Sequence, residues 1–559
     1  MANLSYDRAM MEAVDEYLNK FTMSHPQSIS LPRDTSILKD MLDGLLEACN
    51  MTIEIESALR TKEEKWSKLK SLRPEMIATV ILRTQHIRLI QFTDEDISMG
   101  RRLAIYQCSG PNEGIYSTDT DEIERLVMEY SPSISQKDLD AVVKRLRLYS
   151  PLVQRCRDRD LIAVNNGIFN FRTKTLQPFD PELVFTVKSR INYTPNAINQ
   201  IIYNPNDNTN WDVESWMNDL SDDPEIVNLL WEILGAIIRP NVRWNKSAWF
   251  YSTTGNNGKG TLCELMRQLC GAGAYASIPI ADFAKKFALE PLITACAIIV
   301  DENNVGEFVD KAGNLKAVIT NDVIAVEGKY EKPVKLQFFG FMVQCINEMP
   351  RIKDRSDSFY RRQLFVPFDK CFTGRERKYI KDDYLHRAEV LEYVLHKVLH
   401  MDYYTLSEPK ACKDALEEYK EYNDPVRQFV NEILPQCVWD LLPFTFLYDL
   451  YKAWFRRTSP SGTVQGRNKF IGELLSVIDP NVWSCPNKEA RIRPGHRMDW
   501  AEPLIMEYDL KDWMSPLYCQ AGTEVEARPV MKASYSGLQR VNTRNAAYYA
   551  IFDDAKQAC

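Results

Sequence analysis

Apolar residues recur at helical spacing through the first part of the chain. One stripe runs through residues 10–18 and another through residues 38–46, each with an apolar side chain every three or four positions. That spacing places the apolar side chains on one face of a helix, which then packs against a neighbour. We therefore expect residues 1–99 to form a helical N-terminal region.

Short apolar runs separated by turn residues replace this pattern from about residue 100. In residues 161–180 two strand-like runs flank an Asn-Asn-Gly turn, and a helical stretch rich in tryptophan and leucine occupies about 210–240. Turn residues between such runs indicate hairpins. Residues 100–240 are therefore predicted to form an α+β domain.

Strand-like and helical segments alternate from residue 241 to residue 375, which is typical of an α/β unit with a parallel sheet. Residues 376–430 are charged and helical, and we expect them to connect this unit to a last domain. That domain, residues 431–559, has the helical segment PFTFLYDLYKAWF as its clearest element. The predicted fold class is multidomain α/β.

A strand, a glycine-rich loop, a lysine and a helix follow one another at residues 248–269. Backbone N–H groups of such a loop, and the N-terminus of the helix after it, bind phosphate oxygens, and Lys259 would reach the β- and γ-phosphates. The residues expected to contact the nucleotide are Thr254, Gly255, Asn256, Asn257, Gly258, Lys259, Gly260, Thr261 and Leu262.

This loop departs from the pattern G-x-x-x-x-G-K-[ST] at two positions. Thr253 stands in place of the first glycine, and Gly260 stands in place of the serine or threonine. Thr261 is then the nearest hydroxyl for a magnesium ion. An ordinary Asn-Gly turn that carries a surface lysine is the alternative interpretation.

An apolar run at residues 294–300 ends in two acids, Asp301 and Glu302. A strand that delivers acids at its end is a Walker B arrangement, in which Asp301 would hold Mg²⁺ through water and Glu302 would activate the attacking water. An ordinary strand and turn is the alternative. The acids begin 42 residues after Lys259, which favours a shared nucleotide site.

Further polar positions border the next two apolar runs. Asn347 follows the run 338–346, where a sensor amide would contact the γ-phosphate or the lytic water; an ordinary turn asparagine is the alternative. Arg361 and Arg362 precede the run 363–368. An arginine there would stabilise transition-state charge on a phosphate, whereas surface salt bridges are the alternative.

The composition restricts how the chain can meet nucleic acid. Of its 559 residues, 45% are hydrophobic and 26% are charged, and the formal net charge is −8. The surface as a whole therefore does not attract DNA, and any DNA binding needs local basic patches. Residues 454–470 carry no acid and four cations, which we expect to contact phosphates unless they form an ordinary solvated face. These are Arg456, Arg457, Arg467 and Lys469.

Thirteen cysteines are scattered along the chain without a C-x-x-C pair. Structural zinc sites draw on closely spaced ligand pairs, so no structural zinc is expected. Free thiols are typical of a reducing compartment. The sequence shows neither the pattern of a signal peptide nor an apolar run of membrane-spanning length. We therefore expect a cytoplasmic protein that makes no membrane contact.

The order of the segments resembles superfamily 3 helicases, and within them the phage/plasmid and poxvirus primase–helicase branch. The matching segments are GNNGKGT, IIVDEN, AVEGKYEKPVKLQF, CINEMP and FYRRQLFVPF, all within about 125 residues. The segments IYSTDTDEIERLV and IAVNNGIFNFRTKTLQPFDPE resemble the domain upstream of the helicase in that branch. LPFTFLYDLYKAWFRRTSPSG resembles the winged-helix region that follows it. The resemblance covers roughly residues 100–480, and residues 1–95 match nothing.

The resemblance implies an AAA+-like P-loop ATPase core, a C-terminal winged-helix domain and a homo-hexameric ring around DNA, with ATP and Mg²⁺ bound between subunits. It also implies that an arginine after the sensor strand points at the neighbour's γ-phosphate, Arg361 first and Arg362 next. A hairpin that grips DNA should lie within residues 324–338, and the strand-like halves there fit a hairpin. It would carry Lys329, Lys332 and Lys335; a solvated lysine cluster is the alternative.

We therefore expect an ATP-dependent hexameric DNA helicase, 3′→5′ by resemblance, for replication of a phage, plasmid or integrated mobile element. Single-stranded and forked DNA are its expected partners, and replication proteins of the host or element are candidates. An origin-binding initiator ATPase with little translocation and a small-molecule P-loop kinase remain alternatives.

A primase needs a carboxylate pair on a sizeable α/β domain. Three Asp-x-Asp pairs have the spacing, namely Asp94/Asp96, Asp119/Asp121 and Asp158/Asp160. The unassigned N-terminal region, about 95 mostly helical residues, is too small for that fold. Primase activity is therefore not expected.

Overall fold

Residues 1–416 and 417–559 of the computed structural model form two separate units. The structure describes residues 5–24, 35–61, 64–93, 100–304, 308–309, 311–328, 333–352, 354–458, 464–514, 529 and 531–541. The boundary between the units falls inside helix α13 (Lys410–Asn423). The helical connection expected over residues 376–430 is therefore divided between them. None of the described helices has an apolar stretch long enough to cross a membrane.

The N-terminal helices α1 (Tyr6–Ser24), α2 (Thr35–Ala58) and α3 (Pro74–Thr84) follow the two predicted apolar stripes. Met10, Val14 and Leu18 of the first stripe are buried, as are Met41 and Leu45 of the second. This confirms the helical pattern of the stripes. It does not hold throughout residues 1–99, because strand β1 (Ile87–Gln91) lies there.

Strand β1 belongs to a four-stranded sheet of order β3-β2-β1-β4. The other strands are β2 (Arg102–Tyr106), β3 (Tyr116–Ser117) and β4 (Leu152–Gln154), with helices α4 (Thr120–Tyr130) and α5 (Gln136–Tyr149) between β3 and β4. One apolar core joins β1, β2, α4 and α5 to α1, α2 and α3. The predicted boundary at residue 99 therefore runs through a shared core.

Two small antiparallel sheets lead into the central part. Strands β5 (Leu161–Val164) and β6 (Gly167–Asn170) form the hairpin predicted around the Asn-Asn-Gly turn, and β7 (Thr175–Gln177) extends it to a three-stranded meander. Strand β8 (Ile202–Asn204) pairs with β9 (Thr209–Trp211). Helices α6 (Val213–Asp219) and α7 (Pro224–Ile238) follow. All but three residues of α7 are buried, so this helix is the centre of the core.

A five-stranded parallel sheet of order β11-β12-β16-β10-β18 organises residues 241–375. Its strands are β10 (Ser247–Tyr251), β11 (Tyr275–Ala276), β12 (Ala297–Val300), β16 (Phe341–Ile346) and β18 (Gln363–Pro367). In register, Tyr251 pairs with Ile346 and Val300 with Gln344, so the ends of the three middle strands align. The alternating pattern thus forms the predicted parallel α/β unit.

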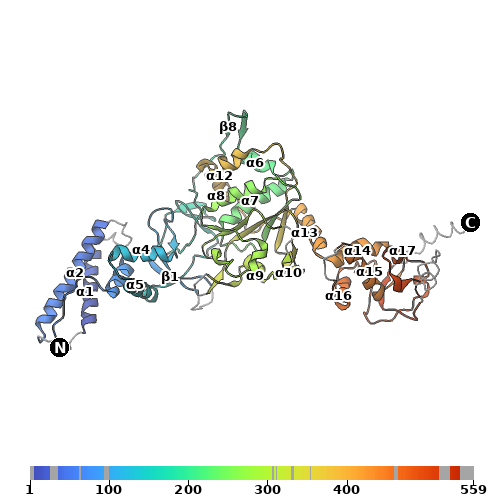
Figure 1. Cartoon of the computed structure of the whole chain (residues 1–559). Coiled ribbons are helices and arrows are strands. Elements are labelled where there is room, and N and C mark those ends of the chain that lie inside the picture. Colours follow the sequence, from blue (N-terminus) through green and yellow to red (C-terminus); the bar gives the residue numbers. More distant parts are fainter. Residues whose placement is uncertain are drawn as a thin grey trace, which may run out of the picture. The chain divides into compact units, whose positions relative to one another are not determined.

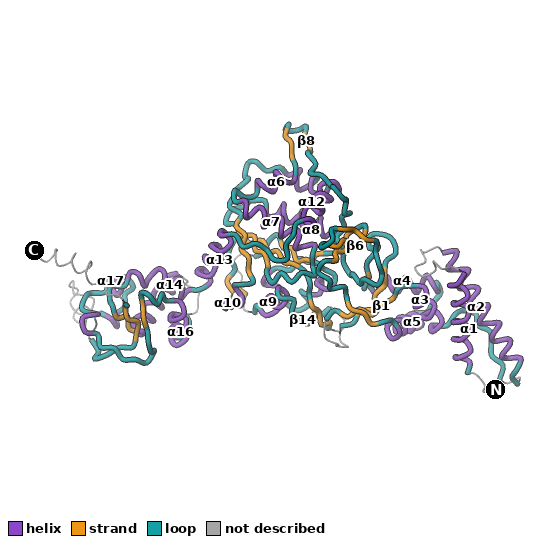
Figure 2. The backbone as a smooth tube through the Cα atoms, turned by 180° about the vertical axis from the view of Figure 1, so that it is seen from behind, coloured by secondary structure: helices purple, strands orange, loops and turns teal. Residues whose placement is uncertain are grey.

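Helices cover both faces of this sheet. Helices α7, α8 (Lys259–Cys270) and α12 (Ala388–His400) lie on one side in Figures 1 and 2, and α9 (Gly313–Ile319) lies on the other. Short elements complete the unit: β13 (Phe308–Val309), β14 (Val323–Val326), β15 (Val334–Gln337), β17 (Arg351–Ile352), α10 (Asp357–Tyr360) and α11 (Lys378–Asp382). Strands β14 and β15 pair antiparallel, which confirms the hairpin expected from the sequence.

The second unit has an aromatic-rich core. Its helices are α14 (Pro425–Ile433), α15 (Phe444–Thr458), α16 (Arg467–Val477) and α17 (Pro503–Glu507), and an antiparallel sheet of order β19-β21-β20 joins β19 (Leu441–Pro443), β20 (Trp483–Ser484) and β21 (Gly537–Arg540). A buried ion pair between Arg540 and Asp440, 3.0 Å apart, links β21 to the residue before β19.

Candidate functional site

Three of the predicted site segments meet where the parallel strands end. The loop 252–258 follows β10, Asp301 follows β12 and Asn347 follows β16. Since β16 pairs with both β10 and β12, their carboxyl ends lie at one edge of the sheet. Ligands of open α/β sheets bind at that edge. The structure therefore brings the predicted loop, acid and amide into one site.

The loop owes its shape to Gly258 and to internal hydrogen bonds. Gly258 has a φ of 87°, a backbone conformation that strains residues with a Cβ atom, and a Cβ there would also lie 2.6 Å from Leu220 Cδ2. The side-chain amide of Asn257 donates to the carbonyl of Thr254 at 2.6 Å. Helix α8 begins at Lys259 without a side-chain cap, which leaves N–H groups of its first turn for an anion.

Lys259 is buried and its ammonium points at the end of β16. It donates to Asn347 Oδ1 at 2.7 Å and to the carbonyl of Ile346 at 3.3 Å. Burial lowers the pKa of Lys259, while nearby Cys345, Asp301 and Cys263 act in the opposite direction. Lys259 and Asn347, predicted separately as loop lysine and sensor amide, are thus in direct contact.

Asp301 lies against the first turn of α8. A Cβ atom on Gly260 would lie 3.0 Å from Asp301 Oδ1 and 3.1 Å from Oδ2. The glycine at position 260, where a serine or threonine is usual, therefore has a local explanation, because the Asp301 carboxylate lies next to the place a side chain would take. Thr261 is half-buried close by, and Glu302 is exposed.

Asn303 is a positioning residue that the sequence reasoning did not single out. Its side-chain amide donates to Gln344 Oε1 and to the carbonyl of Cys345, both at 3.0 Å, and its Oδ1 accepts from the N–H of Ile280 at 2.9 Å. These bonds fasten the chain after Asp301 to β16. The segment IIVDEN, which ends in this asparagine, carried the signal.

A cavity of about 860 Å³ opens beside the loop. Asn256, Gly258 and Thr261 line one side, and the residues opposite come from α6 and from residues 370–382. Ligand cavities commonly measure about 300–1,000 Å³, so a nucleoside fits. Trp211 and Trp216, which belong to the buried core, also line it.

The segment after β18 is tied to the loop by hydrogen bonds. The side-chain amide of Asn256 donates to Glu376 Oε1 at 3.0 Å, and the N–H of Phe372 donates to the carbonyl of Asn256 at 2.7 Å. Asn256 itself has a φ of 54°, which asparagine tolerates better than most residues. Residues 370–382 therefore form one wall of the site, which local sequence patterns did not reveal.

Arg361 and Arg362 lie away from this edge. They precede β18, and the N–H of Ser247, at the start of β10, donates to the carbonyl of Arg362 at 2.9 Å. They are therefore at the amino ends of the parallel strands, opposite Lys259. Arg361 is exposed, whereas the Arg362 guanidinium donates to the carbonyl and hydroxyl of Ser358.

The predicted DNA contacts fall in two places. Lys335 is half-buried on β15, and Lys329 and Lys332 lie outside the described residues. The base of the hairpin is fixed, because the N–H of Gln337 donates to the carbonyl of Phe92 at 3.1 Å and its carbonyl accepts from Arg155 at 2.9 Å.

The four basic residues of the second unit lie at the end of α15 and the start of α16, and all are exposed. Arg457 stacks over Tyr508, 4.2 Å from the ring centre, and Lys469 pairs with Glu473 at 3.6 Å. Arg456 lies in the last turn of α15, and Arg467 is the first residue of α16.

Two of the Asp-x-Asp pairs have structural roles. Asp119 caps α4 by accepting from the N–H of Asp121 at 2.9 Å, and Asp158 accepts from the N–H of Asp160 at 2.9 Å. Asp94 and Asp96 lie outside the described residues.

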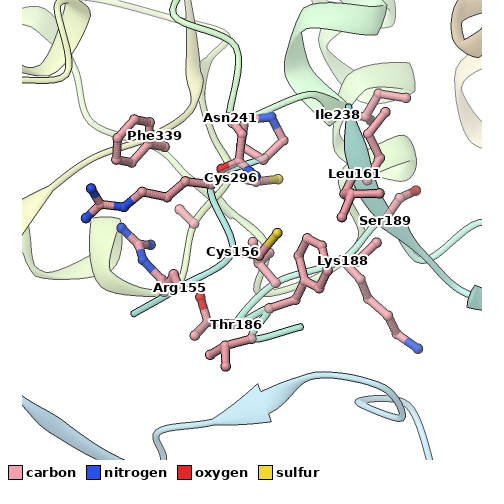
Figure 3. A pocket seen from close by; sticks show the side chains of 18 of the residues that line it. Arg155, Cys156, Leu161, Thr186, Lys188, Ser189, Ile238, Asn241, Cys296 and Phe339 are labelled. Atoms are coloured by element: carbon pink, nitrogen blue, oxygen red, sulfur yellow. The ribbon is translucent and has the colours of Figure 1, made fainter. Parts of the chain in front are cut away.

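A second, smaller cavity of about 50 Å³ lies between residues 155–189 and residues that include Asn241, Cys296 and Phe339 (Figure 3). Arg155, Cys156, Lys188 and Cys296 surround it. The Lys188 ammonium already donates to the carbonyls of Glu113, at 2.7 Å, and Asn165, at 3.3 Å. The cavity is too small for a nucleotide, so it is a packing seam within the first unit.

Known families match three parts of the chain. A "D5 N terminal like" family matches residues 47–222, a family of unknown function (DUF5906) matches residues 250–362, and a "Poxvirus D5 protein-like" family matches residues 421–490. Two viral relatives are each 25% identical. They are "Putative helicase 022R" of Frog virus 3 (isolate Goorha), over 264 residues, and "Putative helicase L207/L206" of Acanthamoeba polyphaga mimivirus, over 236 residues.

These matches support the resemblance to the phage and poxvirus type of superfamily 3 primase–helicases. The family resemblance begins at residue 47, so the expectation that residues 1–95 match nothing was wrong for their second half. The reason is the shared core, since α2, α3 and β1 fold together with the segments recognised after residue 100.

The two relatives are much longer proteins. The matches cover 42% and 39% of this chain but only 27% and 23% of the relatives, so the chain spans about a quarter of their length. A solved structure of the C-terminal region of NrS-1 (305–718) aligns over 84% of this chain and all of that one, at 14% identity and a TM-score of 0.40.

Proposed function

We propose that this primase–helicase relative is an ATP-dependent hexameric DNA helicase that serves replication of a phage, plasmid or integrated mobile element. The contact between Lys259 and Asn347 at the shared edge of β10, β12 and β16 carries the proposal. It places a lysine suited to binding phosphate next to a side-chain amide that can contact the γ-phosphate. The helicase names of the two viral relatives support the same function.

The strand order supports an AAA+-like P-loop core. The sensor strand β16 lies between the loop strand β10 and the acid strand β12, and β18 closes the other side of β10. In this arrangement the loop N–H groups and Lys259 hold the β- and γ-phosphates. Asn347 contacts the γ-phosphate or the lytic water, and exposed Glu302 orients and activates that water.

Mg²⁺ suits the oxygen donors present, a carboxylate on Asp301 and a hydroxyl on Thr261. When bound, the ion would neutralise phosphate charge at the loop. The nucleoside half of ATP would occupy the 860 Å³ cavity between Trp216 and the segment 370–382.

The place of Arg361 supports a ring. It is exposed at the amino ends of the strands, far from its own subunit's loop, so the phosphate it stabilises belongs to a neighbour. Arg362 has its guanidinium engaged by Ser358 and is the second candidate. The β14–β15 hairpin, with Lys329, Lys332 and Lys335, grips the strand in the channel. In the second unit, a winged-helix-like domain presents Arg456, Arg457, Arg467 and Lys469 to phosphates.

The decisive experiment measures ATPase activity with and without single-stranded DNA, and strand displacement on forked duplexes with either single-stranded tail. We expect DNA-stimulated turnover and unwinding with 3′→5′ polarity. Lys259→Ala should abolish both activities, and Glu302→Gln should retain ATP binding but lose hydrolysis. DNA-stimulated turnover without displacement would support an origin-binding initiator instead. Turnover indifferent to DNA would support a small-molecule kinase.

The DNA contacts are tested separately. Replacing Lys329, Lys332 and Lys335 by alanine should reduce unwinding more than basal ATPase. Replacing Arg456, Arg457 and Lys469 should weaken initial DNA binding and reduce its dependence on salt, because fewer counterions are released. Equal losses of binding, unwinding and ATPase in both variants would contradict this division of roles.

A further inference from the structure

Two thiols and a carboxylate converge beneath the phosphate loop. Cys263 of α8 and Cys345 of β16 have their sulfurs 3.3 Å apart, although 82 residues separate them in the chain. Their sulfurs and a carboxylate oxygen of Asp301 all lie within 4.8 Å of one another. Both thiols are fully buried, and Asp301 is half-buried. In the part of the chain that the structure describes, this is the one such group of three.

We propose that Cys263, Cys345 and Asp301 form a binding site for a soft divalent cation, Zn²⁺ or Cd²⁺, that is separate in chemistry from the Mg²⁺ of ATP hydrolysis. Thiolates prefer such soft ions, whereas Mg²⁺ prefers oxygen. Binding of the cation does not depend on the proposed function. Its effect on ATP turnover does, because that effect works through Asp301.

The spacing fits a tetrahedral ion after a small adjustment. Zn–S bonds of about 2.3 Å place two sulfurs about 3.8 Å apart. The thiols must therefore separate by about 0.5 Å from their present 3.3 Å. Asp301 supplies the third ligand, and water can take the fourth position because Asp301 is partly exposed and Gly260 beside it has no side chain.

The charges balance when the ion is bound. Each thiol loses its proton to solvent as its sulfur binds the metal, so two protons leave for each ion. Two thiolates and the carboxylate then carry three negative charges. A divalent cation and the neighbouring Lys259 ammonium carry three positive charges, which makes the buried cluster neutral.

The consequence is a competition for Asp301. A soft ion bound to both sulfurs draws the carboxylate towards β16 and away from the nucleotide. Zn²⁺ should therefore inhibit ATP turnover without destroying the protein, and a chelator should reverse the inhibition.

The chain offers a matched control for these thiols. Cys270 and Cys296 form a second buried thiol pair, with a hydrogen bond between their side chains. No third ligand joins that pair among the described residues. The double variant Cys270→Ala/Cys296→Ala therefore removes two buried sulfur atoms, as many as the proposed site contains, and leaves the proposed ligands unchanged.

The test is a Cd²⁺ titration of the full-length protein in a phosphine reductant, followed by thiolate-to-cadmium ultraviolet absorption, with equilibrium dialysis for stoichiometry. We expect one tight ion per chain in the wild type and in the Cys270→Ala/Cys296→Ala variant. Cys263→Ala and Cys345→Ala should each weaken binding by at least about 100-fold, since each loses a direct ligand. Unchanged tight binding in both variants would overturn the proposal.

Two further measurements separate the site from the proposed function. Cys263→Ser, with thermal unfolding in the absence of metal, checks that lost binding is not lost folding; tight binding by a folded Cys263→Ser protein would also overturn the site. If Cd²⁺ binds but Zn²⁺ leaves ATP turnover unchanged, the site stands and the role of Asp301 in turnover fails. If Lys259→Ala abolishes turnover but the wild type shows no cadmium absorption, the proposed function stands and the site fails.

Discussion

The ammonium of Lys259 lies 2.7 Å from the side-chain oxygen of Asn347, so the first residue of α8 touches the residue that follows β16. The two residues are 88 positions apart in the chain. The carbonyl of Ile346 also accepts from this ammonium, at 3.3 Å, so two oxygens surround the buried charge. ATP binding should therefore exchange one set of partners of Lys259 for another.

Asn347→Ala should lower kcat for ATP by about 10²–10³, because one preorganised polar group at the developing charge is lost. ATP affinity should change little, since the loop and Lys259 remain. Steady-state turnover and binding of a fluorescent ATP analogue measure the two effects. A large loss of affinity with normal kcat would show that Asn347 only positions Lys259.

Gly260→Ser, which restores the usual loop residue, should impair the site instead of improving it. Its Cβ would press on the Asp301 carboxylate at 3.0–3.1 Å. Overpacking of this kind costs about 1–3 kcal/mol, which corresponds to roughly a 5–150-fold loss of turnover if the strain falls on the position of Asp301. Gly313→Ala is the control, because a Cβ there meets nothing within 4 Å. Equal turnover in the serine variant and the wild type would contradict the crowding.

Arg361→Ala should bind ATP, assemble and hydrolyse very slowly, since an arginine finger contributes about 10³–10⁵ in rate. Mixing these subunits with Lys259→Ala subunits should restore part of the ATPase. Where a Lys259→Ala subunit supplies Arg361 and its Arg361→Ala neighbour supplies the phosphate loop, the site between them is complete. Turnover of mixed rings of known composition is the measurement. Absence of rescue in co-assembled rings would remove Arg361 from a role in trans and make Arg362 the next residue to test.

The second unit should lose stability as the pH rises through the range in which Glu502 ionises. Burial raises the pKa of Glu502 to about 7, although the N–H groups of Trp439 and Val438 donate to its carboxylate. In the unfolded chain this group loses its proton near pH 4.5. Between these values the unfolded state releases a proton that the folded state keeps, so stability falls with pH, by at most about 3 kcal/mol.

Glu502→Gln should flatten this dependence while keeping an oxygen for the two N–H groups. Denaturant unfolding of the full chain between pH 5 and 8, followed by tryptophan fluorescence, measures it. A slope of the same size in the glutamine variant would assign the dependence to other groups.

Much of the first unit can be predicted from local patterns. The stripes through residues 10–18 and 38–46 become α1 and α2, and the halves of the segment 324–338 become β14 and β15. Strand β1 escaped prediction because a short apolar run next to a helical region carries no periodicity of its own. The boundary at residue 99 was displaced for the same reason, since β1 pairs with β2 across it.

The candidate site also combines features that the sequence predicts with features that only the tertiary structure reveals. The loop, Asp301 and Asn347 follow apolar strands, and the ends of parallel strands meet at one edge, so the sequence alone predicts that they converge. The roles of Trp216 and the segment 370–382 could not be predicted, because they depend on contacts between distant parts of the chain. Their residue types are equally common in ordinary cores and turns.

The cysteines illustrate the physical reason for this difference between what the sequence and the structure reveal. The sequence determined that there is no C-x-x-C pair, and from that no zinc site was expected. Only the tertiary structure brings Cys263 and Cys345 together, because α8 packs across the sheet and places one sulfur 3.3 Å from the other. Local chemistry, such as a glycine-rich loop or a strand ending in acids, is set by neighbours in sequence. Which side chains share a buried space is set by strand order and helix packing, and these depend on contacts made along the whole length of the sheet.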